Sequence, residues 1–170
     1  MNMQIFVKNH TTGDVIEFEQ MEDVVCELEE LREQAPDQEI EIVKIQTSVM
    51  EIPVTEENIQ ALNECGEERE LEILLNFWKQ VLGVYYTDSL IVAERELEKV
   101  QIYDYYGSDL MECFESFVHD YFEQFGDLNQ FPIDVMYYFD YRKYFNDFKT
   151  NGNHVFALSS GFAFVMKRDC

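Results

Sequence analysis

Basic residues are scarce in this chain. Its 170 residues include 12 Lys plus Arg against 35 Asp plus Glu, so the formal net charge at pH 7 is −23. A nucleic-acid-binding protein needs a basic surface to meet phosphates, and binding to an anionic membrane surface has the same requirement. The composition therefore excludes direct binding to DNA or RNA and to a negatively charged membrane.

Proline and glycine are also few, and long apolar runs are missing. The chain has only 3 Pro and 7 Gly, while 46% of its residues are hydrophobic and 15% aromatic, which is not the composition of a disordered chain. No run of about 18 apolar residues is present, so no transmembrane helix is expected. The first residues lack the apolar stretch of a signal peptide. We expect a folded cytoplasmic protein with a substantial core.

Potential metal ligands are dispersed along the chain. The cysteines, which are Cys26, Cys65, Cys113 and Cys170, form no C-x-x-C pair, and the three histidines are equally scattered. A zinc site needs clustered ligands, and cytoplasmic cysteines are usually reduced. We therefore expect free thiols, no metal and no cofactor.

Catalytic signatures are missing as well. The chain has no glycine-rich nucleotide motif, no P-loop, no nucleophile elbow and no EF-hand loop. Acidic pairs are so abundant that a two-carboxylate site could be drawn almost anywhere, which makes that signal uninformative. Ser159-Ser160-Gly161 fits a hairpin turn better than a nucleophile loop. An enzyme is the least favoured class of function.

Residues 1–54 have the pattern of a small α/β unit. Alternating apolar and polar residues predict strands over 3–8, 15–18 and 39–46. From Met21 the apolar residues recur at i, i+3, i+4 and i+7, which predicts a helix that Pro36 ends.

Residues 55–99 have the pattern of a helical unit. Pro53 marks its boundary, and Thr55 is placed to cap a helix that reaches about Cys65. Two more helices are expected over 67–82 and 88–99, the first with glutamates crowded into its first turns, where the helix dipole favours them.

Residues 100–170 form the third expected unit and hold 19 of the 25 aromatic residues. A strand is expected over 100–106 and a strongly amphipathic helix over 108–125. A second helix should open at Pro132 and reach about Phe148. The expected closing hairpin pairs strands 154–158 and 162–166. The predicted fold class is α+β, an elongated chain of three small subdomains with a strongly acidic surface.

Acidic residues cover the polar faces of these helices. Carboxylates at i, i+3 and i+4 lie about 5–6 Å apart, and each like-charged pair costs roughly 0.2–0.5 kcal/mol. A solvated face that keeps the protein soluble is the simplest explanation, and a halophilic surface is another. A third is a functional anionic surface that copies a polyanion such as DNA. The candidate phosphate-mimicking residues are Glu22, Asp23, Glu27, Glu29, Glu30, Glu33, Glu67, Glu68, Glu70, Glu72, Glu94, Glu98, Asp109, Glu112, Glu115, Asp120 and Glu123.

The C-terminal third contains recognisable residues. The segment from Gly126 to Pro132, followed by Tyr138-Phe139-Asp140-Tyr141 and Tyr144, resembles the antirestriction motif of the ArdA family of antirestriction proteins. The tail from Asn153 to Phe164 is similar to the closing hairpin of that family. Upstream, a strand–strand–helix–strand unit that ends at Ile52-Pro53 and an acidic helical middle follow in the family's order.

This resemblance implies an elongated, acidic, three-part dimer that mimics bent B-DNA. It also implies binding to the methyltransferase core of Type I restriction-modification enzymes and protection of incoming mobile-element or phage DNA. Two copies carry 2 × 23 = 46 net negative charges, the charge of roughly 78 Å of duplex.

The dimer interface is expected in the aromatic C-terminal part, where acids become sparse. About half of the candidate residues are expected to serve the core of the subunit instead. The candidates are Phe131, Pro132, Val135, Met136, Tyr138, Phe139, Tyr141 and Tyr144.

Two other functions stay open at this point. The acidic surface would also suit a decoy for another DNA-binding defence nuclease or regulator. It would equally suit a scaffold for a basic protein.

Overall fold

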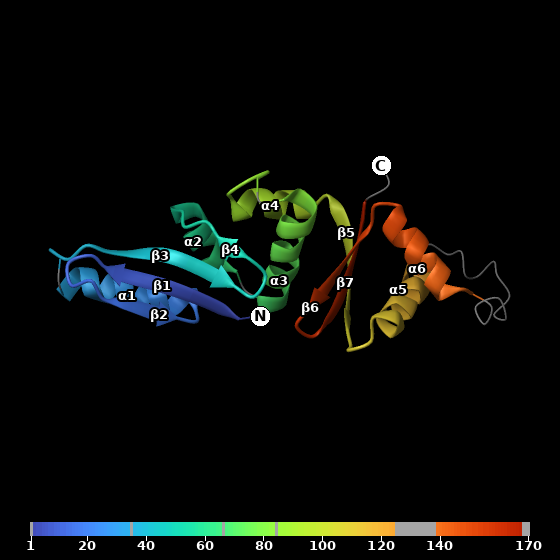
Figure 1. Ribbon diagram of the computed structural model, residues 1–170, viewed down its shortest axis with the longest axis horizontal. Coiled ribbons are helices and arrows are strands. Elements are labelled where there is room, and N and C mark those ends of the chain that lie inside the picture. Colours follow the sequence, from blue (N-terminus) through green and yellow to red (C-terminus); the bar gives the residue numbers. More distant parts are fainter. Residues whose placement is uncertain (1, 35, 66, 84, 125–138, 168–170) are drawn as a thin grey trace. The chain divides into compact units, whose positions relative to one another are not determined.

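The computed structural model describes residues 2–34, 36–65, 67–83, 85–124 and 139–167 (Figure 1). Helices and strands mix in an α+β arrangement, as the sequence predicts. The chain divides into two compact units, Met1–Leu97 and Glu98–Cys170.

The first unit contains an antiparallel sheet with the order β2-β1-β3-β4 in the described residues. Its strands are β1 (Met3–Asn9), β2 (Val15–Phe18), β3 (Ile40–Thr47) and β4 (Glu51–Ile52). Ile5 lies opposite both Phe18 and Ile45, so these side chains share the inner face of the sheet. Phe6 lies opposite Glu17 and Lys44 on the outer face. The two-residue strand β4 was not predicted.

The helices of the first unit follow the predicted pattern with one difference. They are α1 (Met21–Gln34), α2 (Glu56–Glu64), α3 (Glu68–Phe77) and α4 (Leu90–Leu97). The Thr55 hydroxyl accepts a hydrogen bond of 3.1 Å from the backbone N–H of Asn58, which confirms the predicted cap of α2. The helix expected over 67–82 ends as a π-helical turn, η1 (Trp78–Leu82), closed by a 2.8 Å bond from the Gly83 N–H to the Trp78 carbonyl.

One hydrophobic core joins the sheet and these helices. It includes Ile5 and Ile45 of the sheet, Val24 of α1, Leu75 of α3 and Ala93 of α4, and each of these side chains is fully buried. The boundary predicted at Pro53 therefore does not separate two compact units. A shared core is the physical reason, because apolar faces on both sides of Pro53 are buried together.

The second unit begins with β5 (Val100–Tyr106), which has the predicted bounds. The other elements are α5 (Leu110–Gln124), α6 (Tyr141–Thr150), β6 (His154–Leu158) and β7 (Gly161–Lys167). β6 and β7 form the predicted hairpin, and β7 also pairs with β5, which gives the order β5-β7-β6. Gly161 is required there, because a Cβ at this position would overlap the carbonyl oxygen of Tyr105.

The helix predicted from Pro132 to Phe148 has a later described start. α6 begins at Tyr141, and the Asp140 side chain caps it by accepting a bond of 3.0 Å from the Lys143 N–H. The predicted start at Pro132 lies outside the described residues.

Candidate acidic interface

The outward face of α1 carries a row of exposed carboxylates. At 100° per residue, Glu22, Glu29, Glu30 and Glu33 fall within about 100° of one another, opposite the buried Val24. Asp23 is exposed beside them. Glu22 and Asp23 lie in the first turn, where the positive end of the helix dipole stabilises them. Glu27, which was also a candidate, is half-buried on the flank of the helix.

The candidates around α3 and α4 divide into exposed and buried residues. Glu67, Glu68, Glu70, Glu94 and Glu98 are exposed. Glu72 is not, because only 5% of its surface is accessible. The assignment of Glu72 to the solvent surface was wrong. All residues from Leu71 to Phe77 are buried, so this stretch of α3 has no polar outer face for Glu72 to occupy.

Asp109, which precedes α5, and the acids within α5 are all exposed, but Asp109 and Asp120 have structural roles. Asp109 accepts hydrogen bonds from the N–H groups of Met111 and Glu112 at 2.7 and 3.1 Å, so it caps the helix. Asp120 accepts a 2.6 Å bond from the Tyr105 hydroxyl. Glu112, Glu115 and Glu123 project from the same helix with exposed side chains.

A dense aromatic core holds α5 in place. Phe114 packs at ring-centroid distances of 5.6 Å from Phe148 of α6 and 5.5 Å from Phe164 of β7. Phe117 stacks on Phe164 at 5.0 Å with an interplanar angle of 20°. Rings have few rotatable bonds, so this core fixes the helix with little internal freedom. The acids of α5 therefore project from a rigid support.

Three of the residues predicted for a dimer interface pack within their own chain. The ring centroid of Phe139 lies 5.3 Å from that of Tyr144 and 4.9 Å from that of Tyr141. All three rings contact the aromatic core. Burial raises the pKa of both tyrosine hydroxyls above the ordinary value. Each of the three side chains remains half-exposed. The other five candidates, Phe131, Pro132, Val135, Met136 and Tyr138, lie outside the described residues.

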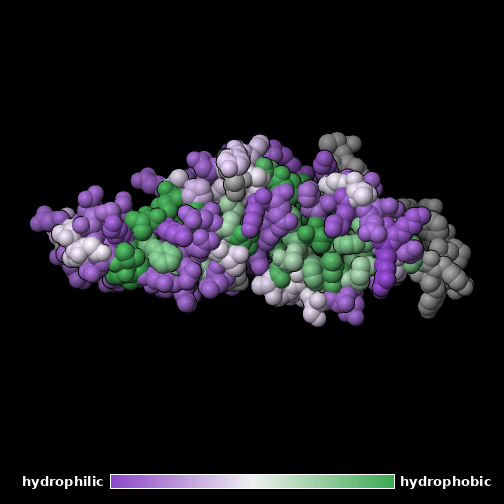
Figure 2. Space-filling view, in the orientation of Figure 1, coloured by the Kyte–Doolittle hydropathy of each residue, from purple (hydrophilic) through white to green (hydrophobic). Residues whose placement is uncertain are grey.

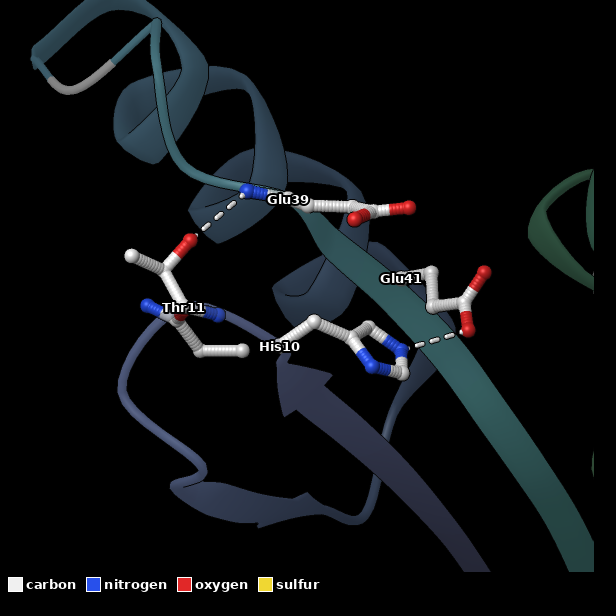
Figure 3. A network of polar contacts seen from close by, with 5 residues as sticks. His10, Thr11, Glu39 and Glu41 are labelled. Carbon is white, nitrogen blue, oxygen red and sulfur yellow. Dashed lines mark hydrogen bonds and ion pairs between the residues drawn. The ribbon is translucent and has the colours of Figure 1, made fainter.

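The outer face of the first sheet has a different charge pattern. The His10 ring contacts the Glu41 carboxylate at 2.7 Å, and Thr11 accepts a bond from the backbone N–H of Glu39 (Figure 3). Lys44 lies 3.6 Å from Glu51. Hydrophobic and hydrophilic side chains alternate over these strands in the view of Figure 2. This mixed face was not predicted, although β3 carries one residue of each charge, Glu41 and Lys44.

Potential metal ligands stay apart in the described residues. Within the described ranges, no three His, Cys, Asp or Glu side chains come together to hold a metal ion. The half-buried Cys65 thiol has a raised pKa, chiefly because burial disfavours the thiolate. Across the same ranges, no helix has the length and apolar character needed to cross a membrane.

Comparisons with protein-family models, with curated proteins and with solved structures gave no match for this chain.

Proposed function

We propose that this protein is a DNA mimic that occupies the DNA-binding groove of a Type I restriction-modification enzyme and so protects incoming DNA. The observation that carries the proposal is the row of exposed carboxylates on α1, together with the exposed acids of α5. Each row lies on a regular helix that is anchored by the packed core of its own unit, so the backbone spacing of the carboxylates within each row is fixed. A fixed array of negative charge is what a phosphate-binding groove recognises without reading bases.

The charge is large enough for this role. A net charge of −23 equals the charge on roughly 39 Å of B-DNA axis. Solubility needs far less, since a net charge of magnitude about 2–8 suffices for a small domain. Repulsion between neighbouring carboxylates occurs on several helices of this chain. Binding of a partner with a positively charged groove would offset that repulsion.

The target is proposed on the resemblance of the C-terminal segment to the ArdA family. The methyltransferase core of a Type I enzyme encloses DNA in a basic groove, and the exposed acids would line its walls. The proposal includes a homodimer, in which the exposed parts of Phe139, Tyr141 and Tyr144 contribute to the contact. A light-scattering mass equal to one chain at micromolar concentration would contradict this part of the proposal.

The experiment that tests the function is an inhibition assay with purified components. The full chain is added to Type I enzymes with different recognition sequences, and both DNA cleavage and methylation are measured. Inhibition should not depend on the recognition sequence, because a mimic offers charge and no bases. The control is a basic protein without a DNA groove, which should bind the chain far more weakly. If the control binds as tightly as the enzyme, the protein is a general acidic scaffold.

A further inference from the structure

A groove lies between α1 and α2, above the beginning of β3. It has a volume of about 580 Å³, within the range of ligand clefts. Its apolar lining includes Val25 and Leu28 of α1, Ile40 of β3, Val54 just before α2, and Ile59 within α2. Four of these five side chains are half-buried, and Val54 is 39% exposed. The groove therefore leaves apolar surface in contact with water.

The rim of this groove is acidic. Glu29 of α1 and Glu56 at the start of α2 line it with exposed side chains. Glu41 also borders the groove, but its carboxylate contacts His10 on the outer sheet face. Among the described residues that line the groove, none is Lys, Arg or His. An apolar floor between carboxylates fits an occupant with an apolar face and cationic flanks.

We infer that this groove binds an amphipathic, cationic α-helix of a partner protein. Walls formed by two helices, α1 and α2, and an apolar floor suit the helix-in-groove mode, in which residues at i, i+3, i+4 and i+7 of the bound helix enter the groove. Lys or Arg residues beside that apolar face would then meet Glu29 and Glu56. The inference does not depend on the DNA-mimic proposal, because it rests on an apolar surface that phosphate mimicry does not need. Glu29 is the one described residue that belongs to both the α1 row and the rim of the groove.

A second copy of this chain is a poor occupant. α6 carries Arg142, Lys143 and Lys149, the largest group of cations on any helix in the described residues. However, its aromatic face is packed against α5 and β7 in its own subunit, as Phe148 is 3% exposed. The described helices α1 to α5 each carry more acids than bases, and the rim would repel them.

The test uses the full chain and synthetic labelled peptides. The probe is a helical Leu/Lys peptide of about 14 residues with leucines on one face, which spans roughly 21 Å at 1.5 Å per residue. A scrambled peptide of the same composition has the same charge but no apolar face, and a Leu/Glu peptide has the face but the opposite charge. Binding is measured by fluorescence anisotropy. The protein should bind the helical Leu/Lys peptide, and its affinity for the scrambled peptide and for the Leu/Glu peptide should be at least about tenfold lower.

A matched pair of substitutions locates the site. Val54→Arg places a cation in the groove, and Val43→Arg places one on the outer sheet face at a residue of similar exposure, 39% against 41%. Val54→Arg should weaken binding of the Leu/Lys peptide about tenfold, while Val43→Arg should leave it within about twofold. Circular dichroism verifies that both variants fold, and Ile59→Ala replaces Val54→Arg if that variant does not.

The outcomes are decisive in either direction. Selective loss with Val54→Arg or Ile59→Ala supports the groove as the site. Equal loss with Val43→Arg, or equal binding of the scrambled peptide, would overturn the inference, because the peptide would then bind the diffuse acidic surface. Neutralising the α1 row at Glu22, Glu30 and Glu33 should leave peptide binding within about threefold, which separates this site from the proposed DNA-mimicking surface.

Discussion

The side-chain oxygen of Asn58 accepts a hydrogen bond of 2.7 Å from the backbone N–H of Leu90, the residue that begins α4. The amide nitrogen of Asn58 donates to the carbonyl oxygens of Pro53 and Asp88 at 2.9 and 2.8 Å. The Asn58 side chain is fully buried. Asn58 of α2 therefore links Pro53, which directly follows β4, to the start of α4.

Replacing Asn58 with Ala should destabilise the protein. The change removes these three bonds and leaves two carbonyls and one helix N-terminal N–H without their partner. The expected loss in the free energy of unfolding is about 2–4 kcal/mol, since unsatisfied buried groups cost about 1–3 kcal/mol each and relax in part. Urea unfolding of the full chain measures it. Asn63→Ala, at an exposed position of the same helix, is the control and should stay within about 0.5 kcal/mol of the wild type.

The Asn58 network also shows where sequence reasoning was limited. Thr55 was predicted as a cap from its type and position alone, and the bounds of β5 followed from simple alternation. Pro53 was interpreted as a boundary because local patterns carry no information on contacts 32 residues apart, such as Asn58 with Leu90. Two-residue β4 is too short for any periodicity.

The candidate site was predictable to a similar extent. Exposed acids on α1 and α5 follow from amphipathic spacing, which assigns one face of each helix to water. Glu72 was misplaced because α3 is buried around its whole circumference over Leu71–Phe77, and a single-stripe pattern cannot reveal that. The mixed charge on the outer sheet face depends on strand register, which brings Lys44 to Glu51 across two strands.

Inhibition of the restriction enzyme should depend on the combined charge of the exposed carboxylates, and no single carboxylate should be essential. Glu30→Gln alone should change the affinity for the restriction enzyme less than about fivefold, because one exposed charge pair contributes about 0–1 kcal/mol. The quadruple variant Glu22→Gln, Asp23→Asn, Glu30→Gln and Glu33→Gln should weaken it about 10- to 100-fold. Titration of cleavage activity measures both.

The control for that experiment is a charge-matched quadruple variant on the outer sheet face. It changes Glu17, Glu39, Glu41 and Glu51 to Gln, where Lys8, Lys44 and His10 already reduce the negative field. This variant should inhibit nearly as well as the wild type. Equal losses in the two variants would mean that net charge alone matters, and loss from one substitution would indicate a discrete active site.

Alkaline pH should lower the free energy of unfolding of the second unit, because the Tyr105 hydroxyl loses its proton. Burial and the hydrogen bond to Asp120 raise the pKa of its hydroxyl well above the ordinary value of 10.0. Because the folded protein holds this proton more tightly than the unfolded chain, the stabilisation is complete below pH 10 and declines as pH rises above it. Tyr103, Tyr141 and Tyr144 have raised pKa values as well and add to the decline.

The Tyr105→Phe variant isolates the contribution of that residue. It should lose about 0.5–1.5 kcal/mol at pH 7, where the hydrogen bond to Asp120 is intact in the wild type. Between pH 9.5 and about 11.5, its stability should fall less steeply than that of the wild type. Urea unfolding at a series of pH values measures both effects. Parallel curves for the two proteins would show that Tyr105 ionises freely in the folded state. Tyr85→Phe, at a fully exposed side chain, serves as the control.

Competition between this protein and DNA for a Type I methyltransferase core tests the central claim most directly. The affinity of the full chain is measured by titration calorimetry with and without a duplex carrying the recognition site, at salt concentrations from about 0.05 to 0.5 M, over which the Debye length falls from roughly 14 to 4 Å. The DNA-mimic account predicts mutually exclusive binding and an affinity that falls steeply with salt. A ternary complex of enzyme, duplex and protein, or an affinity that is independent of salt, would contradict it.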